Sequence, residues 1–327
     1  MGKRLKNKKA LLAALLGLLA VLPFLGFTNY MVRVMVNCLL YVALALSLNL
    51  FSGVCGQISL GHIGFFCIGA YTSALLALKL NLPFILCFLA AGLMAGLVGL
   101  CIAIPSLKLS GGYLAIITLS FSEVIRLIIL NWVELTRGPM GLPNIPPISF
   151  FGWAFKSNKP YYYFMLVFCI LLVILMRNLI DSRYGRDLKA IRDDEIASEA
   201  MGVNNYRDKV VVFATVALIA GLVGSVFAHC MRFIDPSSFK IDVSMLILSM
   251  VVLGGMGNLT GSVIAAVVLI LLPEVLRGFE NYRMLCYGLA LVVMMLMRAI
   301  KPESYRRWWD TLKRGLSFGR HGKDSEV

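Results

Sequence analysis

Long apolar blocks joined by short polar connections make up the chain from residue 10 to residue 299. A helix needs about 20 mostly apolar residues to cross ~30 Å of hydrocarbon, and several of these blocks reach that length. The pattern therefore predicts an all-α fold, a polytopic membrane bundle of about ten transmembrane helices. The third and eighth blocks are the least regular. The predicted spans are 10–28, 31–51, 58–78, 83–104, 112–132, 161–180, 210–230, 243–259, 261–277 and 284–299.

The composition agrees with a membrane protein. Hydrophobic residues make up 59% of the 327 residues, and the mean hydropathy is +0.84. Soluble proteins contain about 45–50% apolar residues. The net charge of +14 does not indicate nucleic-acid binding, because most basic residues lie in two tails and one central loop. Such clusters indicate membrane topology and contact with anionic lipid headgroups of the bilayer.

These three basic groups predict the orientation of the chain. Five basic residues lie in the tail 1–9, six in the loop 181–209 and eight from residue 298 onwards. Six predicted spans separate the first two groups and four separate the last two, so all three lie on one side. By the positive-inside rule that side is the cytoplasm. We expect a transmembrane domain over 10–299, with both the N-terminal tail and the C-terminal tail 300–327 in the cytoplasm.

The first apolar run, from Ala10 to Phe27, follows basic residues and so has the layout of a secretory signal sequence. The run is about as long as a true span, however, and no small-x-small cleavage site follows it. We therefore expect a first transmembrane helix that is retained.

Two glycine-rich segments, at 53–69 and 254–261, interrupt the predicted spans in opposite halves of the chain. Irregular backbone at membrane depth must face protein or water, because lipid offers it no hydrogen-bond partner. Paired interruptions of this kind point to a central path through the membrane. The alternative is close helix packing by small residues. The candidate path residues in these segments are Gln57, Ser59, Gly61, His62, Gly64, Gly254, Gly255 and Gly257.

Glu123 and Arg126 are two further candidates for the path. They lie three residues apart in the fifth predicted span, and hence on one helix face. Charges at this depth normally pair with one another or face a cavity. An ion pair that stabilises the bundle is the first interpretation, and recognition of a zwitterionic solute is the second.

The loop 181–209 is the only substantial cytoplasmic connection that the topology predicts. Its apolar residues, from Leu188 to Ala200, predict a short amphipathic helix, which Gly202 would end. A short helix of this kind could present one face to a cytosolic ATPase. The alternative is a solvated connection whose charges serve topology alone. The candidate coupling residues are Arg192, Asp193, Asp194, Glu195, Ala197, Glu199 and Gly202.

Enzymatic and metal chemistry are not expected. The eight cysteines are scattered without a CxxC pair, and the three histidines are isolated, so we predict no metal site and no cofactor. The sequence has no G-x-x-x-x-G-K-[ST] phosphate loop and cannot itself be an ATPase. The lone acidic residues in the spans form no catalytic cluster, which argues against a membrane-embedded enzyme.

Four blocks of sequence resemble the permease subunits of branched-chain amino acid ABC importers, the LivM/LivH family, and are more similar to LivM. Together they cover most of the chain from residue 35 to residue 300. Arg137 departs from the family pattern, which often has a small residue before the glycine-rich turn. The blocks are Gly56–His62 with Phe65–Tyr71, Gly138–Leu142, Gly185–Val203 and Val252–Gly261.

The resemblance implies an importer built from several subunits in a bacterial or archaeal cytoplasmic membrane. The expected partners are two ATP-binding cassette subunits, a second and non-identical permease subunit, and an external solute-binding protein. The expected solutes are branched-chain amino acids. Urea or short-chain amides are the alternative within the family, and an autonomous secondary carrier is the alternative outside it.

Overall fold

The structure, a computed structural model, describes residues 28–275 except 108, 110, 151, 152 and 156, together with residues 288 and 292. The chain forms two compact units, Met1–Leu271 and Leu272–Val327, and almost all described residues belong to the first. The predicted first span, the predicted last span and both basic tails therefore lie almost wholly outside the described residues.

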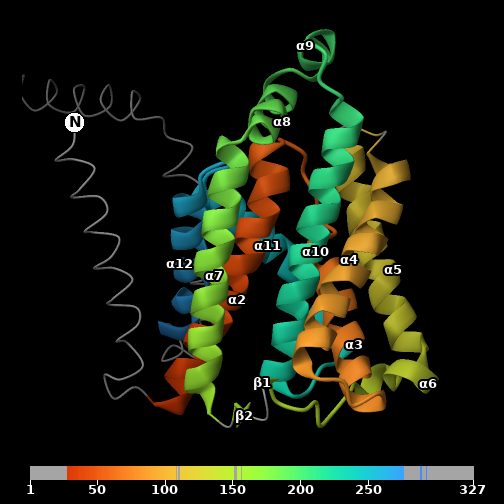
Figure 1. Ribbon diagram of the computed structural model, residues 1–327, viewed down its shortest axis with the longest axis vertical. Helices are drawn as coiled ribbons and strands as arrows, with labels where there is room; N and C mark the ends of the chain where they lie inside the picture. Colours follow the sequence, from red (N-terminus) through yellow and green to blue (C-terminus); the bar gives the residue numbers. More distant parts are fainter. Residues whose placement is uncertain are drawn as a thin grey trace, which may run out of the picture. The chain divides into compact units, whose positions relative to one another are not determined.

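The described part is helical, and six of its helices are long and apolar enough to cross a membrane (Figure 1). The fold is thus a multi-pass helical bundle, as predicted, and each of these helices overlaps one predicted span. Their boundaries differ from the prediction by a few residues. The six are α2 (Asn29–Leu48, continued by the π-helix η2, Asn49–Val54), α3 (His62–Lys79), α4 (Phe84–Ser106), α5 (Gly112–Asn131), α7 (Asn158–Asp181) and α10 (Asn205–Met231).

Two shorter apolar helices, α11 (Ile241–Gly254) and α12 (Leu259–Val275), lie where we predicted spans at 243–259 and 261–277. At 1.5 Å per residue they are about 21 Å and about 26 Å long, which is less than the hydrocarbon thickness. The first one ends early because Gly255 adopts a φ of 103° that a continuing helix does not allow.

The centre of the bundle is α10, which lies against both α3 and α4, while α2 packs against α7. Small residues make this possible. A Cβ added at Gly69 of α3 would lie 2.2 Å from the Gly221 carbonyl oxygen of α10, and one at Gly224 would lie 2.2 Å from the Phe66 oxygen. The helix backbones therefore touch where these glycines meet.

The connections between the long helices lie at two opposite ends of the bundle. Tyr206, at the start of α10, donates to the Ile104 carbonyl near the end of α4 at 2.8 Å. The short helices α8 (Arg183–Asp193) and α9 (Glu195–Ala200) lie at this same end (Figure 1). The connection from α5 to α7 lies at the other end, where Leu142 pairs with Ile234. This up-and-down arrangement is the one that the spans predict.

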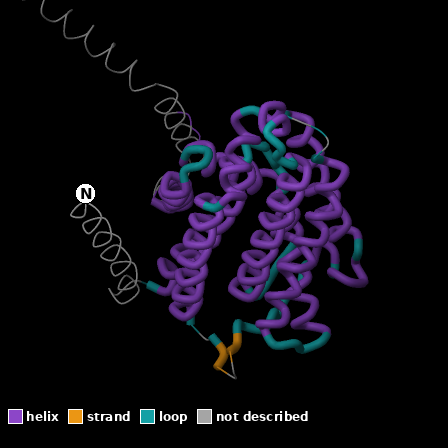
Figure 2. Tube along the Cα trace, turned by 45° about the horizontal axis from the view of Figure 1, so that its top comes forward, coloured by secondary structure: helices purple, strands orange, loops and turns teal. Residues whose placement is uncertain are grey.

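The α5–α7 connection carries the turn and strand elements of the described chain, and its hairpin stands out in Figure 2. Arg137 has a φ of 61°, in the left-handed region where a residue with a side chain is strained. This gives a physical reason why a smaller residue suits that position. The elements are α6 (Val133–Thr136), η3 (Gly138–Met140), β1 (Ser149–Phe150) paired antiparallel with β2 (Trp153–Ala154), and, after α10, η4 (Pro236–Phe239).

Substitution of Gly69 by alanine should destabilise the bundle, because its new methyl group would overlap the Gly221 backbone. Overpacking of this kind costs about 1–3 kcal/mol. We expect a lower thermal unfolding temperature in detergent. The matched control is Gly112→Ala, since nothing lies within 4 Å of a Cβ added there. Equal unfolding temperatures for the two variants would contradict close α3–α10 packing.

Candidate functional site

The two glycine-rich segments meet at one point in the structure. Asn49 and Gly53 belong to η2, and Gly257 lies in the turn between α11 and α12. The Gly257 N–H donates to Asn49 Oδ1 at 2.8 Å. A Cβ at Gly53 would lie 2.3 Å from the Gly257 nitrogen, so the two backbones are in direct contact. We call this contact of η2 with the α11–α12 turn the glycine junction.

Arg192, in the last turn of α8, lies against the glycine junction. Its Nη1 donates to the Gly53 carbonyl oxygen at 2.8 Å. Its Cγ would lie 2.8 Å from a Cβ at Gly56, and its Nη1 would lie 3.0 Å from one at Gly257. The guanidinium therefore links the 181–209 loop to both glycine-rich segments.

Three buried polar groups on the helices that form the glycine junction have no hydrogen-bond partner among the described residues. They are the Asn49 Nδ2 amide, the Ser52 hydroxyl and the Ser262 hydroxyl. Asn49 and Ser52 belong to η2, and Ser262 lies in the first turn of α12. Buried polar groups without partners are rare in folded proteins and call for a physical reason. The π-helix is itself a form that occurs frequently at functional sites.

The polar candidates of the first segment lie within or beside this region. His62 is only 2% exposed, and its Nε2 lies 2.9 Å from Ser47 Oγ. Ser59 is buried, with its hydroxyl near the Gly61 N–H, and Gln57 is half-buried. These contacts are all within the protein. A role of Gln57, Ser59 and His62 in the transport path therefore stays a prediction.

The glycine candidates pack helices. A Cβ at Gly61 would lie 2.6 Å from the Thr118 carbonyl oxygen, and one at Gly64 would lie 3.0 Å from the Ser122 Cα, both on α5. Gly254 likewise faces the start of α12. These contacts agree with the packing interpretation, and they place the three glycines at helix contacts.

Glu123 and Arg126 form the ion pair that their spacing suggests. Arg126 Nε lies 3.0 Å from both Glu123 carboxylate oxygens, and Nη2 also donates to Oε1. The side chains are 29% and 20% exposed, near the middle of α5. The pair lies beside the first glycine-rich segment, since Gly64 packs against Ser122, the residue before Glu123.

The 181–209 loop folds into two helices, where we expected one. Ser182 caps α8 by accepting from the Gly185 N–H, and Asp194 caps α9 by accepting from the Ile196 and Ala197 N–H groups. Two separate caps explain the break, because Asp194 itself has extended backbone. Gly202, with a φ of 88°, then ends α9 as predicted.

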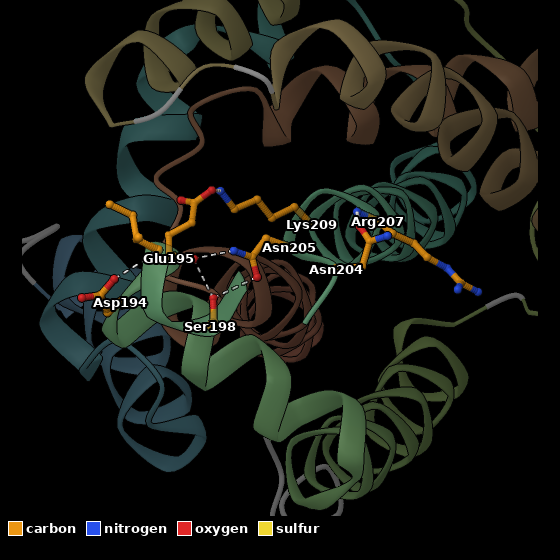
Figure 3. Close-up of polar contacts among 8 residues, drawn as sticks. Asp194, Glu195, Ser198, Asn204, Asn205, Arg207 and Lys209 are labelled. Carbon is orange, nitrogen blue, oxygen red and sulfur yellow. Dashed lines mark hydrogen bonds and ion pairs between the residues drawn. The ribbon is translucent and has the colours of Figure 1, made fainter. Parts of the chain in front are cut away.

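The turn from α9 into α10 is tied by a polar network (Figure 3). Lys209 is almost fully buried, and its ammonium pairs with the Glu195 carboxylate. Asn205 Nδ2 donates to the Glu195 carbonyl at 2.6 Å, and Ser198 Oγ lies 2.9 Å from Asn205 Oδ1. The α9 helix is thus fixed to the first turn of α10.

The docking of α8 is equally specific. Leu188 and Ile191 are buried, and Tyr184 donates to the Asp208 carbonyl at 2.6 Å. Burial raises the pKa of the Tyr184 phenol above its ordinary value, so this donor keeps its proton. The two helices and the start of α10 therefore form one connected corner.

The outward side of this corner carries exposed apolar side chains. Ile196 is 82% exposed and Met201 is 86% exposed. Asp193, Ala197 and Glu199 are exposed beside them. Among the predicted coupling residues, Arg192 is the one whose side chain bonds to the glycine junction.

Several residues of the site had no signal in the sequence. Asn49 and Ser52 lie inside an apolar block, and nothing in their spacing predicts a π-helix. His229 is 1% exposed and hydrogen-bonds Ser73 Oγ at 2.9 Å and the Pro146 oxygen at 2.7 Å. Among the described residues, no group of three or more His, Cys, Asp or Glu could hold a metal ion.

Substitution of Glu195 by glutamine should destabilise the loop, because Lys209 would keep its buried charge without a counterion. Loss of one partner of a buried polar pair costs roughly 1–3 kcal/mol. A lower thermal unfolding temperature in detergent checks this. Glu199→Gln, the same change at an exposed position of α9, is the control and should leave the temperature unchanged.

Comparisons with known proteins agree with this structure. The sequence profile of the branched-chain amino acid transport system permease component family matches residues 30–297. The high-affinity branched-chain amino acid transport system permease protein LivM of Escherichia coli K12 is 37% identical, over 89% of this chain and 74% of LivM. The LivM of Salmonella typhimurium is 36% identical over the same shares.

Two more distant relatives extend the comparison. The probable LivM of Methanocaldococcus jannaschii is 25% identical over 67% of each chain, and the ribose import permease protein RbsC of Haemophilus influenzae is 21% identical over 70% of this chain and 72% of RbsC. No solved structure matches significantly. With a family profile that covers most of its length, the chain belongs to the family of branched-chain amino acid transport permease components.

Proposed function

We propose that this chain is the membrane-spanning permease subunit of an ABC importer that carries branched-chain amino acids across the cytoplasmic membrane of a bacterium or archaeon. The observation that carries the proposal is the 37% identity to LivM of Escherichia coli, whose name gives that solute class. ATP would be hydrolysed by partner subunits. The chain acts as a path and not as a catalyst.

The proposed assembly holds two ATP-binding cassette subunits, a second and non-identical permease subunit and an external solute-binding protein. The end of the bundle that carries α8 and α9 faces the cytoplasm in this proposal, and both chain termini lie on that side. The basic residues of the 181–209 loop support this orientation. The α5–α7 connection then faces outward, toward the binding protein.

The α9 corner is the proposed docking surface for an ATPase subunit. Ile196 and Met201 expose apolar side chains on the same short turn, and the charged residues Asp193 and Glu199 lie beside them. A protruding apolar tip with a charged rim fits a groove on another protein. Because α9 is tied to α10 through Glu195 and Asn205, force on this tip would reach the bundle.

The path is proposed to run past the two glycine-rich segments, with Gln57, Ser59 and His62 nearby. Glu123 and Arg126 are partly exposed near the middle of α5, where contact with lipid would be costly. We propose that the second permease subunit or the aqueous path covers this pair. A zwitterionic amino acid, with one ammonium and one carboxylate, matches its two opposite charges, and so recognition of the solute is the second interpretation of the pair.

Uptake by the intact assembly tests the function. The assembly is purified through a tag on this chain and placed in proteoliposomes with its binding protein. We expect accumulation of radiolabelled leucine that requires ATP. Uptake of urea in place of leucine would support the amide alternative, and leucine uptake that needs neither ATP nor partner subunits would indicate a secondary carrier and contradict the proposal.

Charge placed on the α9 tip should block assembly with the ATPase. We expect the double substitution Ile196→Asp and Met201→Asp to lower the recovery of ATPase subunits with the tagged chain by about tenfold, since an apolar contact would then bury two carboxylates. Met140→Asp is the control, because Met140 is 83% exposed at the opposite end. Undiminished recovery of the ATPase with the double variant would show that it docks elsewhere.

A further inference from the structure

Arg192 differs from the other charged residues of the α8–α9 corner in what it touches. It lies four residues before the exposed Ile196, yet its guanidinium donates to the Gly53 carbonyl of η2 at 2.8 Å. Its methylene stem lies over Gly56 so closely that a Cβ there would come within 3.2 Å of the Arg192 Cβ. One side chain thus connects the proposed motor surface with the proposed path.

The element that Arg192 contacts has irregular and incomplete hydrogen bonding. Gly53 lies in the π-helix η2, where the Cys55 N–H reaches back to the Leu50 carbonyl at 3.2 Å, one residue further than in an α-helix. Asn49 Nδ2 and Ser52 Oγ in the same six residues have no hydrogen-bond partner among the described residues. A rearrangement that gave these groups partners would recover the free energy lost by leaving them unpaired. The hydrogen bonding of η2 in this conformation is therefore incomplete.

The second glycine-rich segment would move with it. The Gly257 N–H donates to Asn49 Oδ1, and the Gly257 backbone also touches that of Gly53. The turn between α11 and α12 is therefore attached to the same six residues. Any displacement of η2 is passed to both glycine-rich segments at once.

From these contacts we infer that Arg192 is a positioning residue for transport: its bond to the Gly53 carbonyl transmits movement of the α8–α9 corner to the glycine junction. The inference rests on the proposed function, because it requires an ATPase that moves α9. The inference goes beyond the proposed function because it names a single contact through which that movement reaches the path.

The test compares leucine transported per ATP hydrolysed in proteoliposomes that contain the intact assembly. Arg192→Met keeps a long apolar stem over Gly56 but removes every donor, so this ratio should fall about tenfold while ATP hydrolysis and assembly persist. Arg192→Lys keeps a charged donor and should retain most of the ratio. Arg186→Met is the matched control on the exposed side of α8, and its ratio should equal that of the parent.

Each other result counts against the inference. An unchanged ratio in Arg192→Met would show that the Gly53 bond transmits nothing. Loss of assembly or of ATP hydrolysis in that variant would assign Arg192 a purely structural role, and so would an equal loss of coupling in Arg192→Lys. If the parent assembly hydrolyses ATP and transports no leucine, the proposed function is wrong. If only the Arg192 variants behave otherwise than expected, the inference about Arg192 is wrong.

Discussion

The hydrogen bond from Arg192 to the Gly53 carbonyl joins three parts of the chain that are far apart in sequence. The buried backbone of Gly53 needs a donor for its carbonyl, because an unpaired buried polar group costs free energy. At Gly53 the donor comes from a helix outside the span. The contact is possible only because Gly53, Gly56 and Gly257 lack side chains, which allows the guanidinium and two backbones to share one small volume.

The same physical rule organises the rest of the bundle. Gly69 and Gly221 bring α3 and α10 into backbone contact, while Gly61 and Gly64 do the same for α3 and α5. In a membrane, helices associate through close packing and interhelical hydrogen bonds. The glycine-rich segments thus have a packing role in this conformation, and any change in the path must move closely fitted helices together.

The positions and order of the six long helices that the structure describes could be predicted from hydropathy, because each is an apolar block of nearly the required length. The total of ten spans stays a prediction. The end of α9 at Gly202 could also be predicted, since glycine favours that position for local reasons. The sequence did not predict the early end of α11, the π-helix at Asn49–Val54 or the bond from Arg192 to Gly53. These depend on which segments meet in space, and a single sequence does not record that. The sequence placed Arg192 in the ATPase-facing group, a role that stays a prediction, and the structure adds a bond from its side chain to Gly53 of η2.

A reversible cross-link tests the central claim that the α8–α9 corner and the glycine junction move as one body. Cysteines at Gly56 and Arg192, in a background in which Cys55 is serine, would have Cβ atoms about as close as a disulfide requires. The account predicts that the reduced protein, which lacks Arg192, hydrolyses ATP with little leucine transport, and that oxidation restores transport by replacing the lost contact with a bond. Continued ATP hydrolysis with no recovery of transport in the fully oxidised protein would contradict it.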